Sequence, residues 1–331
     1  MHPSISINAL DRLAPWWLPG GHAQTIWPAY ATRIAVGVPP YQRERWITPD
    51  LDFVDVDWVH STSPLSPLLV LFHGLEGNSQ SHYALAFARS AQARGWAYAV
   101  PHFRGCSGEI NRAPRAYHSG DFEEIGWILS EIARRHKGPI VAVGVSMGGN
   151  ALLRWAQEMG MGAAATVRAV ASIGVPLDLA AAGRALSRGI NRRLYTPMFL
   201  RSMKPRAMRK LAQFPGLFDA EALRRASDLH AFDNVFTAPL HGFKNTDDYW
   251  RRASAAPHMQ RLQLPSLVVN AENDPFVPAH SLPSASELKR NANIETWRTR
   301  HGGHIGYWQG TPAATHLSET VVDWLKTRIE P

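Results

Sequence analysis

Short apolar runs alternate with helical patterns along most of this chain, and this alternation constrains its fold more than any other feature. Six runs have the length and composition of buried strands: residues 67–73, 96–103, 139–145, 167–174, 266–271 and 294–299. Apolar residues recur at helical spacing in residues 81–95, 121–136, 148–159 and 313–328. A chain that alternates strands with helices builds a mostly parallel sheet with helices on both faces. We therefore predict an α/β fold.

The alternation stops between residues 177 and 259, where no strand is convincing. This stretch is helical in pattern, and four prolines interrupt it: Pro197, Pro205, Pro215 and Pro239. Because strands resume after it, we expect a core of residues 51–176 and 260–331 with a helical insertion at 177–259, placed to cover the site as a lid. Residues 1–50 carry four tryptophans among prolines and glycines, and we expect them to pack irregularly on the core.

Composition excludes several classes of protein. The 331 residues are 45% hydrophobic and 19% charged, which is typical of a globular chain. Cys106 is the single cysteine, so no disulfide within the chain is possible, and its glycine-rich turn favours a small buried residue over a nucleophile. No basic and apolar leader opens the sequence, and no apolar run reaches the length of a spanning helix. We expect a cytoplasmic protein, at most peripheral to a membrane.

The formal charge of +8 is concentrated in the predicted insertion, where residues 184–210 contain nine basic residues and no acidic one. Apolar residues recur there at helical spacing, with arginines on other faces: Leu186, Ile190, Leu194 and Met198, against Arg188, Arg192 and Arg193. This pattern fits a solvated lid whose apolar side forms an acyl pocket, and it also fits a basic helix on an anionic membrane. No nucleic-acid recognition motif accompanies the arginines, so we expect no nucleic acid as a partner.

A serine stands between two glycines at the end of a predicted strand. Gly144, Ser146 and Gly148 follow the strand at 139–145 and precede the helix at 148–159. In this context a G-x-S-x-G motif forms a sharp turn that exposes the serine hydroxyl, because the glycines let strand and helix approach closely. We predict that Ser146 is a nucleophile rather than a small residue in an ordinary turn.

A serine hydroxyl needs a base and an orienting carboxylate, which follow it in the order Ser, acid, His in such folds. Asp274 comes just after the strand at 266–271, and His304 comes just after the strand at 294–299. Asp178 is the rival acid and His301 the rival base. We favour Asp274 because its Asn-Asp-Pro turn orders its own backbone. We favour His304 because the glycines around it suit a loop tip that reaches the serine.

The oxyanion of an acyl-transfer reaction needs two backbone N–H donors. One comes from the residue after the nucleophile, here Met147, and the other from the loop after an early strand. In that loop, residues 72–80, we assign the second donor to Leu75, because Gly74 and Gly77 let the chain turn its amides inward.

Eight short blocks resemble one known family in their order along nearly the whole chain. They are PWWLPGGHAQTIWP (15–28), HGLEG (73–77), HFRGCSGE (102–109), YHSGD (117–121), GVSMGGN (144–150), TAPLHGF (237–243), NDPFVP (273–278) and HGGHIGY (301–307). The chain resembles the YheT-like branch of the α/β-hydrolases, which also contains membrane-associated phospholipases and alcohol acyltransferases. The resemblance implies the α/β-hydrolase fold, Ser146, Asp274 and His304 as a triad, and carboxyl esters as substrates. One departure is His102, where the family pattern has asparagine.

These observations predict a serine esterase that acts on a small-molecule ester or a lipid, and they imply no metal or organic cofactor. Two related activities share the acyl-enzyme: transfer of the acyl group to an alcohol, and phospholipid hydrolysis at a membrane surface. A ligand-binding protein with a vestigial serine turn is the non-enzymatic alternative, and the complete set of triad residues argues against it.

Overall fold

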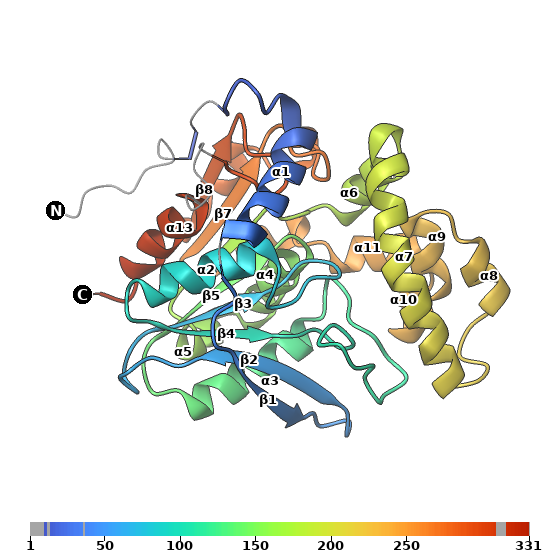
Figure 1. The fold of residues 1–331 in the computed structure, drawn as a ribbon, viewed down its shortest axis with the longest axis horizontal. Helices are drawn as coiled ribbons and strands as arrows, with labels where there is room; N and C mark the ends of the chain where they lie inside the picture. The colour runs from blue at the N-terminus through green and yellow to red at the C-terminus, as the bar shows by residue number, and fades with distance from the viewer. Residues whose placement is uncertain (1–9, 12–13, 36, 309–315, 331) are drawn as a thin grey trace.

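The computed structural model describes residues 10–11, 14–35, 37–308 and 316–330. Within these residues one eight-stranded sheet runs in the order β1-β2-β4-β3-β5-β6-β7-β8 (Figure 1). Its strands are β1 (Gln42–Ile47), β2 (Phe53–Val59), β3 (Leu68–Phe72), β4 (Ala97–Pro101), β5 (Ile140–Val145), β6 (Val170–Ile173), β7 (Ser266–Ala271) and β8 (Ile294–Thr299). β2 pairs antiparallel with β1 and with β4, and all other neighbours are parallel. All six strands expected from the apolar runs are present, so the predicted α/β fold is confirmed.

The inner strands are buried on both faces, which explains why they form continuous apolar runs. Four helices cover the two faces: α2 (His82–Gln92), α3 (Phe122–Arg135), α4 (Met147–Met159) and α13 (His316–Lys326). Along β3, Leu68 joins the core that includes α3 and α4, and Leu69 joins the core that includes α2 and α13. The described part of the predicted C-terminal helix is α13, and residues 313–315 of that prediction lie outside the described residues.

The amino-terminal part of the chain is more regular than we predicted. Residues Gly20–Ala35 form the helix α1, and β1 follows within residues 1–50, so the expectation of irregular packing is wrong where the structure describes this segment. α1 begins with two glycines and carries Pro28 inside it. Glycine and proline are the poorest helix formers, so the sequence lacks the pattern by which a helix is recognised.

β1 and β2 were also not predicted, because charged residues interrupt their apolar residues: Arg43, Glu44 and Arg45 in β1, and Asp55 and Asp57 in β2. Arg43 lies opposite Asp57, and Arg45 lies opposite Asp55, in the antiparallel register of the two strands. Each arginine forms an ion pair with its partner at 2.7 Å. Such cross-strand pairs stabilise a ladder without the continuous apolar run by which the other strands were predicted.

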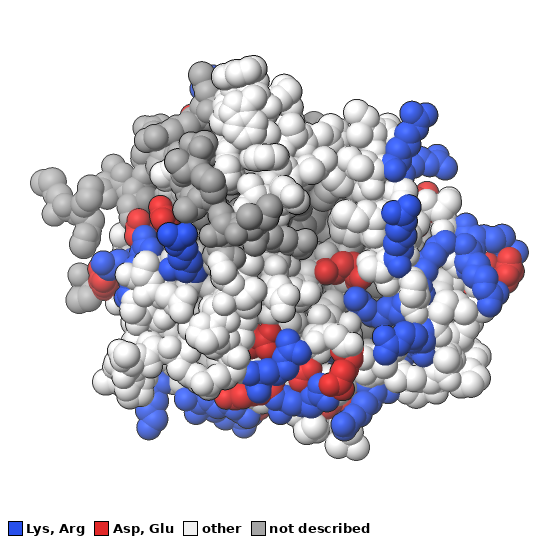
Figure 2. All heavy atoms as spheres, viewed as in Figure 1, with Lys and Arg blue, Asp and Glu red and all other residues white. Residues whose placement is uncertain are grey.

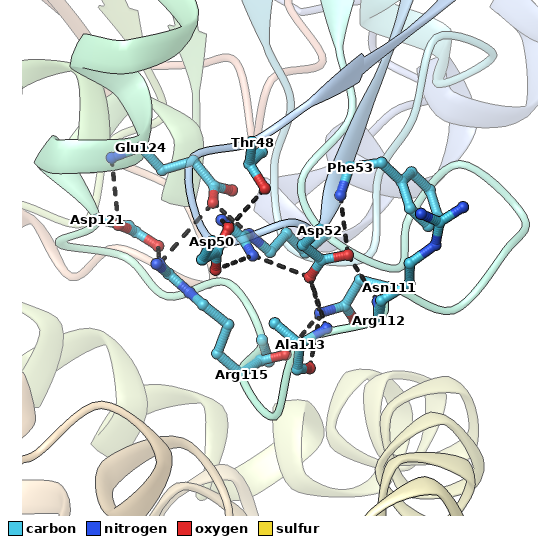
Figure 3. Close-up of polar contacts among 12 residues, drawn as sticks. Thr48, Asp50, Asp52, Phe53, Asn111, Arg112, Ala113, Arg115, Asp121 and Glu124 are labelled. Atoms are coloured by element: carbon cyan, nitrogen blue, oxygen red, sulfur yellow. Dashed lines mark hydrogen bonds and ion pairs between the residues drawn. The ribbon is translucent and has the colours of Figure 1, made fainter.

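A buried polar cluster holds the turn between β1 and β2 against the loop that follows β4 (Figure 3). Asp52 accepts hydrogen bonds from the backbone N–H groups of Arg112 and Ala113, at 2.6 and 3.0 Å. The Asn111 side chain and Arg104 also donate to it, at 2.8 and 2.9 Å. Burial raises the pKa of Asp52, but the hydrogen bonds outweigh this effect and the pKa lies below its ordinary value. The loop is therefore fixed by an ionised carboxylate.

Six helices lie between β6 and β7, where the insertion was expected: α6 (Leu179–Leu186), α7 (Gly189–Gln213), α8 (Ala220–Arg225), α9 (Leu229–Val235), α10 (Thr237–Leu240) and α11 (Thr246–Ala253). They lie together to one side of the sheet, at the right of Figure 1. Two further short α-helices, α5 (Ala163–Thr166) and α12 (Ala285–Leu288), lie outside the insertion.

The insertion has an apolar core of its own, in which Leu200, Leu223 and Phe232 are buried. This core explains one difference from the sequence prediction: Pro197 and Pro205 lie inside α7 and do not end it. A proline inside a helix removes one hydrogen bond and crowds the preceding turn. The packing of α7 on the other helices offsets that cost.

Candidate active site

Ser146 lies in a strained turn between β5 and α4. Its φ of 53° is in a region that residues with a side chain seldom adopt. Neighbouring glycines make the turn possible: a Cβ built on Gly144 would lie 2.5 Å from the Gly149 Cα, and one on Gly148 would lie 2.4 Å from the His73 carbonyl oxygen. Strand and helix therefore approach as closely as the sequence motif predicts, and the serine side chain is turned out of the core.

The structure brings Ser146, His304 and Asp274 together in one hydrogen-bonded chain. The Ser146 Oγ and the His304 Nε2 are 3.1 Å apart, and the His304 Nδ1 lies 2.8 Å from the Asp274 Oδ2. Both Asp274 and His304 are buried. The second Asp274 oxygen accepts from the backbone N–H groups of Phe276 and Val277, at 2.7 and 3.2 Å. Because the Nδ1–H donates a hydrogen bond to the carboxylate, the Nε2 lone pair faces the serine hydroxyl.

The rival residues have other contacts. Asp178 caps the amino terminus of α6 by accepting from the Ala181 N–H at 3.0 Å. His301 accepts a hydrogen bond from Thr299 through its backbone carbonyl. Among the polar contacts of the described residues, the Asp178 side chain does not bond to His304 and the His301 side chain does not bond to Ser146; the groups in contact are Asp274, His304 and Ser146.

The two residues predicted to supply the oxyanion donors are Met147, which follows Ser146 in the chain, and Leu75, on a loop next to it. Met147 is the first residue of α4, so its N–H has no partner within the helix. A Cβ built on Gly74 would lie 3.2 Å from the Ser146 Cβ, so the loop that carries Leu75 passes directly beside the serine. The amides of Gly74 and Glu76 donate to tyrosine hydroxyls. Among the hydrogen bonds of the described residues, none uses the amide of Leu75 or of Met147.

His73 and Glu76 hold this loop in shape. His73 accepts from the Phe103 N–H at its Nε2, so its Nδ1 donates to the Gly74 carbonyl at 2.8 Å. Burial, together with the nearby His102, lowers the pKa of His73 to about 3, and its ring is neutral.

Glu76 links the loop to the insertion. Its Oε1 accepts from the Tyr117 hydroxyl and from the Arg206 guanidinium of α7, both at 2.7 Å. A movement of α7 would therefore act on the residue next to Leu75.

α1 holds the two loops that carry Asp274 and His304. The Gln24 Oε1 accepts from the Asn273 side chain at 2.8 Å and from the Gly302 N–H at 2.9 Å. The Thr25 hydroxyl accepts from the His304 N–H at 2.8 Å. Sequence reasoning missed this role, although both residues lie in the first of the eight family blocks, which was the available signal.

An apolar cavity of about 150 Å³ opens on these groups. Its wall includes Ser146 and His304 from the core, and Phe199, Met203 and Phe232 from the insertion.

Part of our prediction for this wall is wrong. Leu186 lines the cavity, but the three residues expected to continue its apolar row are exposed: Ile190 by 60%, Leu194 by 44% and Met198 by 51%. The reason is that α6 ends at Leu186 and α7 begins at Gly189, so the break changes which face points inward.

Other groups singled out in the sequence lie apart from the cavity. Cys106 is buried, and burial raises the pKa of its thiol from 9.0 to about 12. His102 is buried, and its Nε2 lies 2.9 Å from Asp57.

No group of His, Cys, Asp and Glu side chains in the described residues could hold a metal ion. Within the same residues, no helix has both the length and the apolar character needed to cross a bilayer.

Comparisons with known proteins give the following likenesses. Residues 67–311 match the family described as alpha/beta hydrolase fold. The chain is 37% identical to the Escherichia coli protein YheT, named as an esterase, over 93% of this chain and 91% of that protein. It is 27% identical to human phospholipase ABHD3, over 95% of this chain and 78% of that protein.

Two solved esterases are similar in fold. For Pf2001 of Pyrococcus furiosus the TM-score is 0.56 at 15% identity, over 88% of this chain and 93% of the other. For Est1E of Butyrivibrio proteoclasticus with bound ferulic acid it is 0.56 at 15% identity, over 86% and 99%.

Proposed function

The chain belongs to the YheT-like branch of the α/β-hydrolase family, and from this premise we propose that it is a serine hydrolase that cleaves carboxylic esters through an acyl-enzyme on Ser146. The observation that carries the proposal is the chain of hydrogen bonds from Asp274 through His304 to Ser146, beside an apolar cavity. A binding site for an apolar ligand would need the cavity but not these three groups in register.

The proposed reaction has two steps. As the Ser146 Oγ attacks the ester carbonyl carbon, the His304 Nε2 takes the hydroxyl proton, and Asp274 stabilises the resulting imidazolium. The amides of Leu75 and Met147 hold the oxyanion. His304 then passes its proton to the departing alkoxide, and the alcohol leaves. In the second step, water attacks the acyl-enzyme with His304 again as base, and the acid is released.

The cavity wall supports an acyl chain as the group that the site binds. Phe199, Met203 and Phe232 offer apolar surface, and burial of each CH₂ of a chain contributes about 0.8 kcal/mol. The named phospholipase among the relatives supports a lipid as one such ester. In this proposal, residues 177–259 act as a lid on a core of residues 51–176 and 260–331, and the lid makes peripheral contact with an anionic membrane.

Hydrolysis of p-nitrophenyl esters of increasing chain length, with a fluorophosphonate probe for the nucleophile, tests the proposal. We expect Ser146→Ala to lower kcat by about 10⁶-fold, the loss typical of a triad serine, and to abolish labelling. Ser119→Ala is the matched control. Ser119 also lines the cavity, and its Asn150 contact persists through the Ser119 carbonyl, so activity should remain.

If the wild type neither turns over an ester nor reacts with the probe, the proposal fails and a binding function takes its place. Product analysis with an added alcohol identifies the acyl acceptor. We expect the free acid, and a new ester as the main product would instead make the protein an acyltransferase.

A further inference from the structure

The outer face of α7 presents an apolar row to solvent. Ile190, Leu194 and Met198 are spaced four residues apart, so they lie on one face of the helix, and each is at least 44% exposed. The opposite face of the same helix carries Phe199, Met203 and Ala207 to the wall of the cavity. One helix therefore has apolar residues both toward the candidate active site and toward solvent.

Arginines flank the exposed row without acidic neighbours on the same helices. Residues 179–213 contain no Asp or Glu, and Arg188, Arg192 and Arg193 are exposed. Among the ion pairs of the described residues, none includes these three arginines. Figure 2 shows Lys and Arg side chains gathered over the side of the molecule where Figure 1 places α7. This face of the insertion is cationic.

The α1 segment, which contacts α7, carries exposed aromatic residues of its own. Trp16, in the turn before α1, is 91% exposed, and Trp27 and Tyr30 are 40% and 62% exposed. α1 touches α7 where the His22 ring stacks on Tyr195, with the His22 Nδ1 3.2 Å from the tyrosine hydroxyl. Tyr195 is adjacent to Leu194, so the two exposed apolar sets lie on neighbouring elements.

We propose that the α1–α7 surface, made of Trp16, Trp27, Tyr30, Ile190, Leu194 and Met198 with the flanking arginines, docks on an anionic lipid bilayer. Basic residues beside exposed apolar residues on a surface helix are typical of interfacial membrane binding. Tryptophan and tyrosine favour the boundary between headgroups and acyl chains. A protein partner would need acidic side chains at positions that match the arginines. An anionic membrane carries negative charge over its whole surface, so it needs no such match.

The inference deepens the proposed function, because α7 joins the docked surface to the cavity. Membrane contact would bring the wall of the acyl pocket to the layer that contains lipid esters. Binding itself does not require catalysis, so it is measured in the Ser146→Ala background. A failure of hydrolysis and a failure of docking are then separate results.

Flotation with vesicles of phosphatidylcholine, with and without phosphatidylglycerol, tests the surface. We expect binding only where phosphatidylglycerol is present, and weaker binding as salt is added. Arg192→Glu with Arg193→Glu should weaken the partition coefficient about 30-fold or more, the effect of losing the surface attraction of two arginines. Ile190→Gln with Leu194→Gln should weaken it about tenfold or more without a change of charge.

Two controls match these variants. Lys137→Glu with Arg168→Glu makes the same change of charge at the amino ends of β5 and β6, and Met161→Gln removes an apolar side chain that is 83% exposed. Both controls should bind like the parent, and all variants should melt at the parent's temperature because only exposed side chains change. No binding by the parent, equal binding to neutral vesicles, or equal losses in variants and controls would each overturn the proposal.

Discussion

Gln24 is the residue through which α1 acts on the two loops that carry Asp274 and His304, and its replacement by leucine is the sharpest test of that role. Gln24 is 3% exposed, and its Oε1 accepts from the Asn273 side chain and from the Gly302 N–H. Leucine has a similar volume but no acceptor. Gln24→Leu therefore removes these two hydrogen bonds, together with the one that the Gln24 Nε2 donates to the Leu18 carbonyl at 3.0 Å, and leaves the shape of α1 nearly unchanged.

The expected loss of stability is set mainly by the two buried donors, Asn273 Nδ2 and Gly302 N–H, that lose their acceptor; the Leu18 carbonyl also loses its donor, which adds to the loss. A buried donor without a partner costs about 1–3 kcal/mol, so two cost about 2–6 kcal/mol. Because leucine buries no polar atom in exchange, we expect the free energy of unfolding to fall by about 3 kcal/mol. Asn273 precedes Asp274, and Gly302 lies two residues before His304. A shift of either loop by about 1 Å would lower kcat by about 100-fold.

Urea unfolding and the steady-state hydrolysis of a soluble p-nitrophenyl ester measure the two effects. KM should change little, because Gln24 does not line the cavity. Gln92→Leu is the control, since Gln92 is exposed at the end of α2 and its loss should change stability by less than about 0.5 kcal/mol. If Gln24→Leu unfolds at the same urea concentration as the wild type and keeps its kcat, α1 does not position the loops.

Three further predictions concern the surroundings of the site. Gly148→Ala should lower the free energy of unfolding in urea by about 3 kcal/mol or more, because the new Cβ would lie 2.4 Å from the His73 carbonyl oxygen. Gly162→Ala is the control and should be tolerated, because its nearest contact would be at 3.5 Å. Equal losses of stability in the two variants would contradict the argument. Burial lowers the pKa of Lys210 from 10.5 to about 8. Between pH 8 and pH 10.5 the unfolded state therefore binds more protons than the folded state, so the free energy of unfolding should rise with pH. The rise from pH 8 to pH 10 should be steeper in the wild type than in Lys210→Met. Equal slopes in the two proteins would contradict this. Iodoacetamide should alkylate Cys106 in urea-unfolded protein but hardly at all in folded protein at pH 8, because burial raises the pKa of its thiol to about 12. Mass spectrometry measures the extent of alkylation, and rapid labelling of the folded protein would refute the prediction.

The sequence determined those features that depend on neighbours along the chain. Buried strands such as β3 and β5 form continuous apolar runs because both faces of the sheet are covered. The turn at Ser146 is predictable because only glycine fits at positions 144 and 148. Asp274 and His304 are found by their places after β7 and β8, since parallel strands bring their carboxyl-end loops to one edge.

Tertiary structure alone decided what depends on residues far apart in the sequence. α1 holds the Asp274 and His304 loops through Gln24 and Thr25, which contact residues about 250 or more positions away, and no periodic pattern records such a contact. The prediction placed Leu186 in one apolar row with Ile190, Leu194 and Met198, but only the last three share a face of α7, and that face meets solvent. Spacing shows which residues share a helix face, whereas the break between α6 and α7 and the packing of the insertion decide that this face meets solvent.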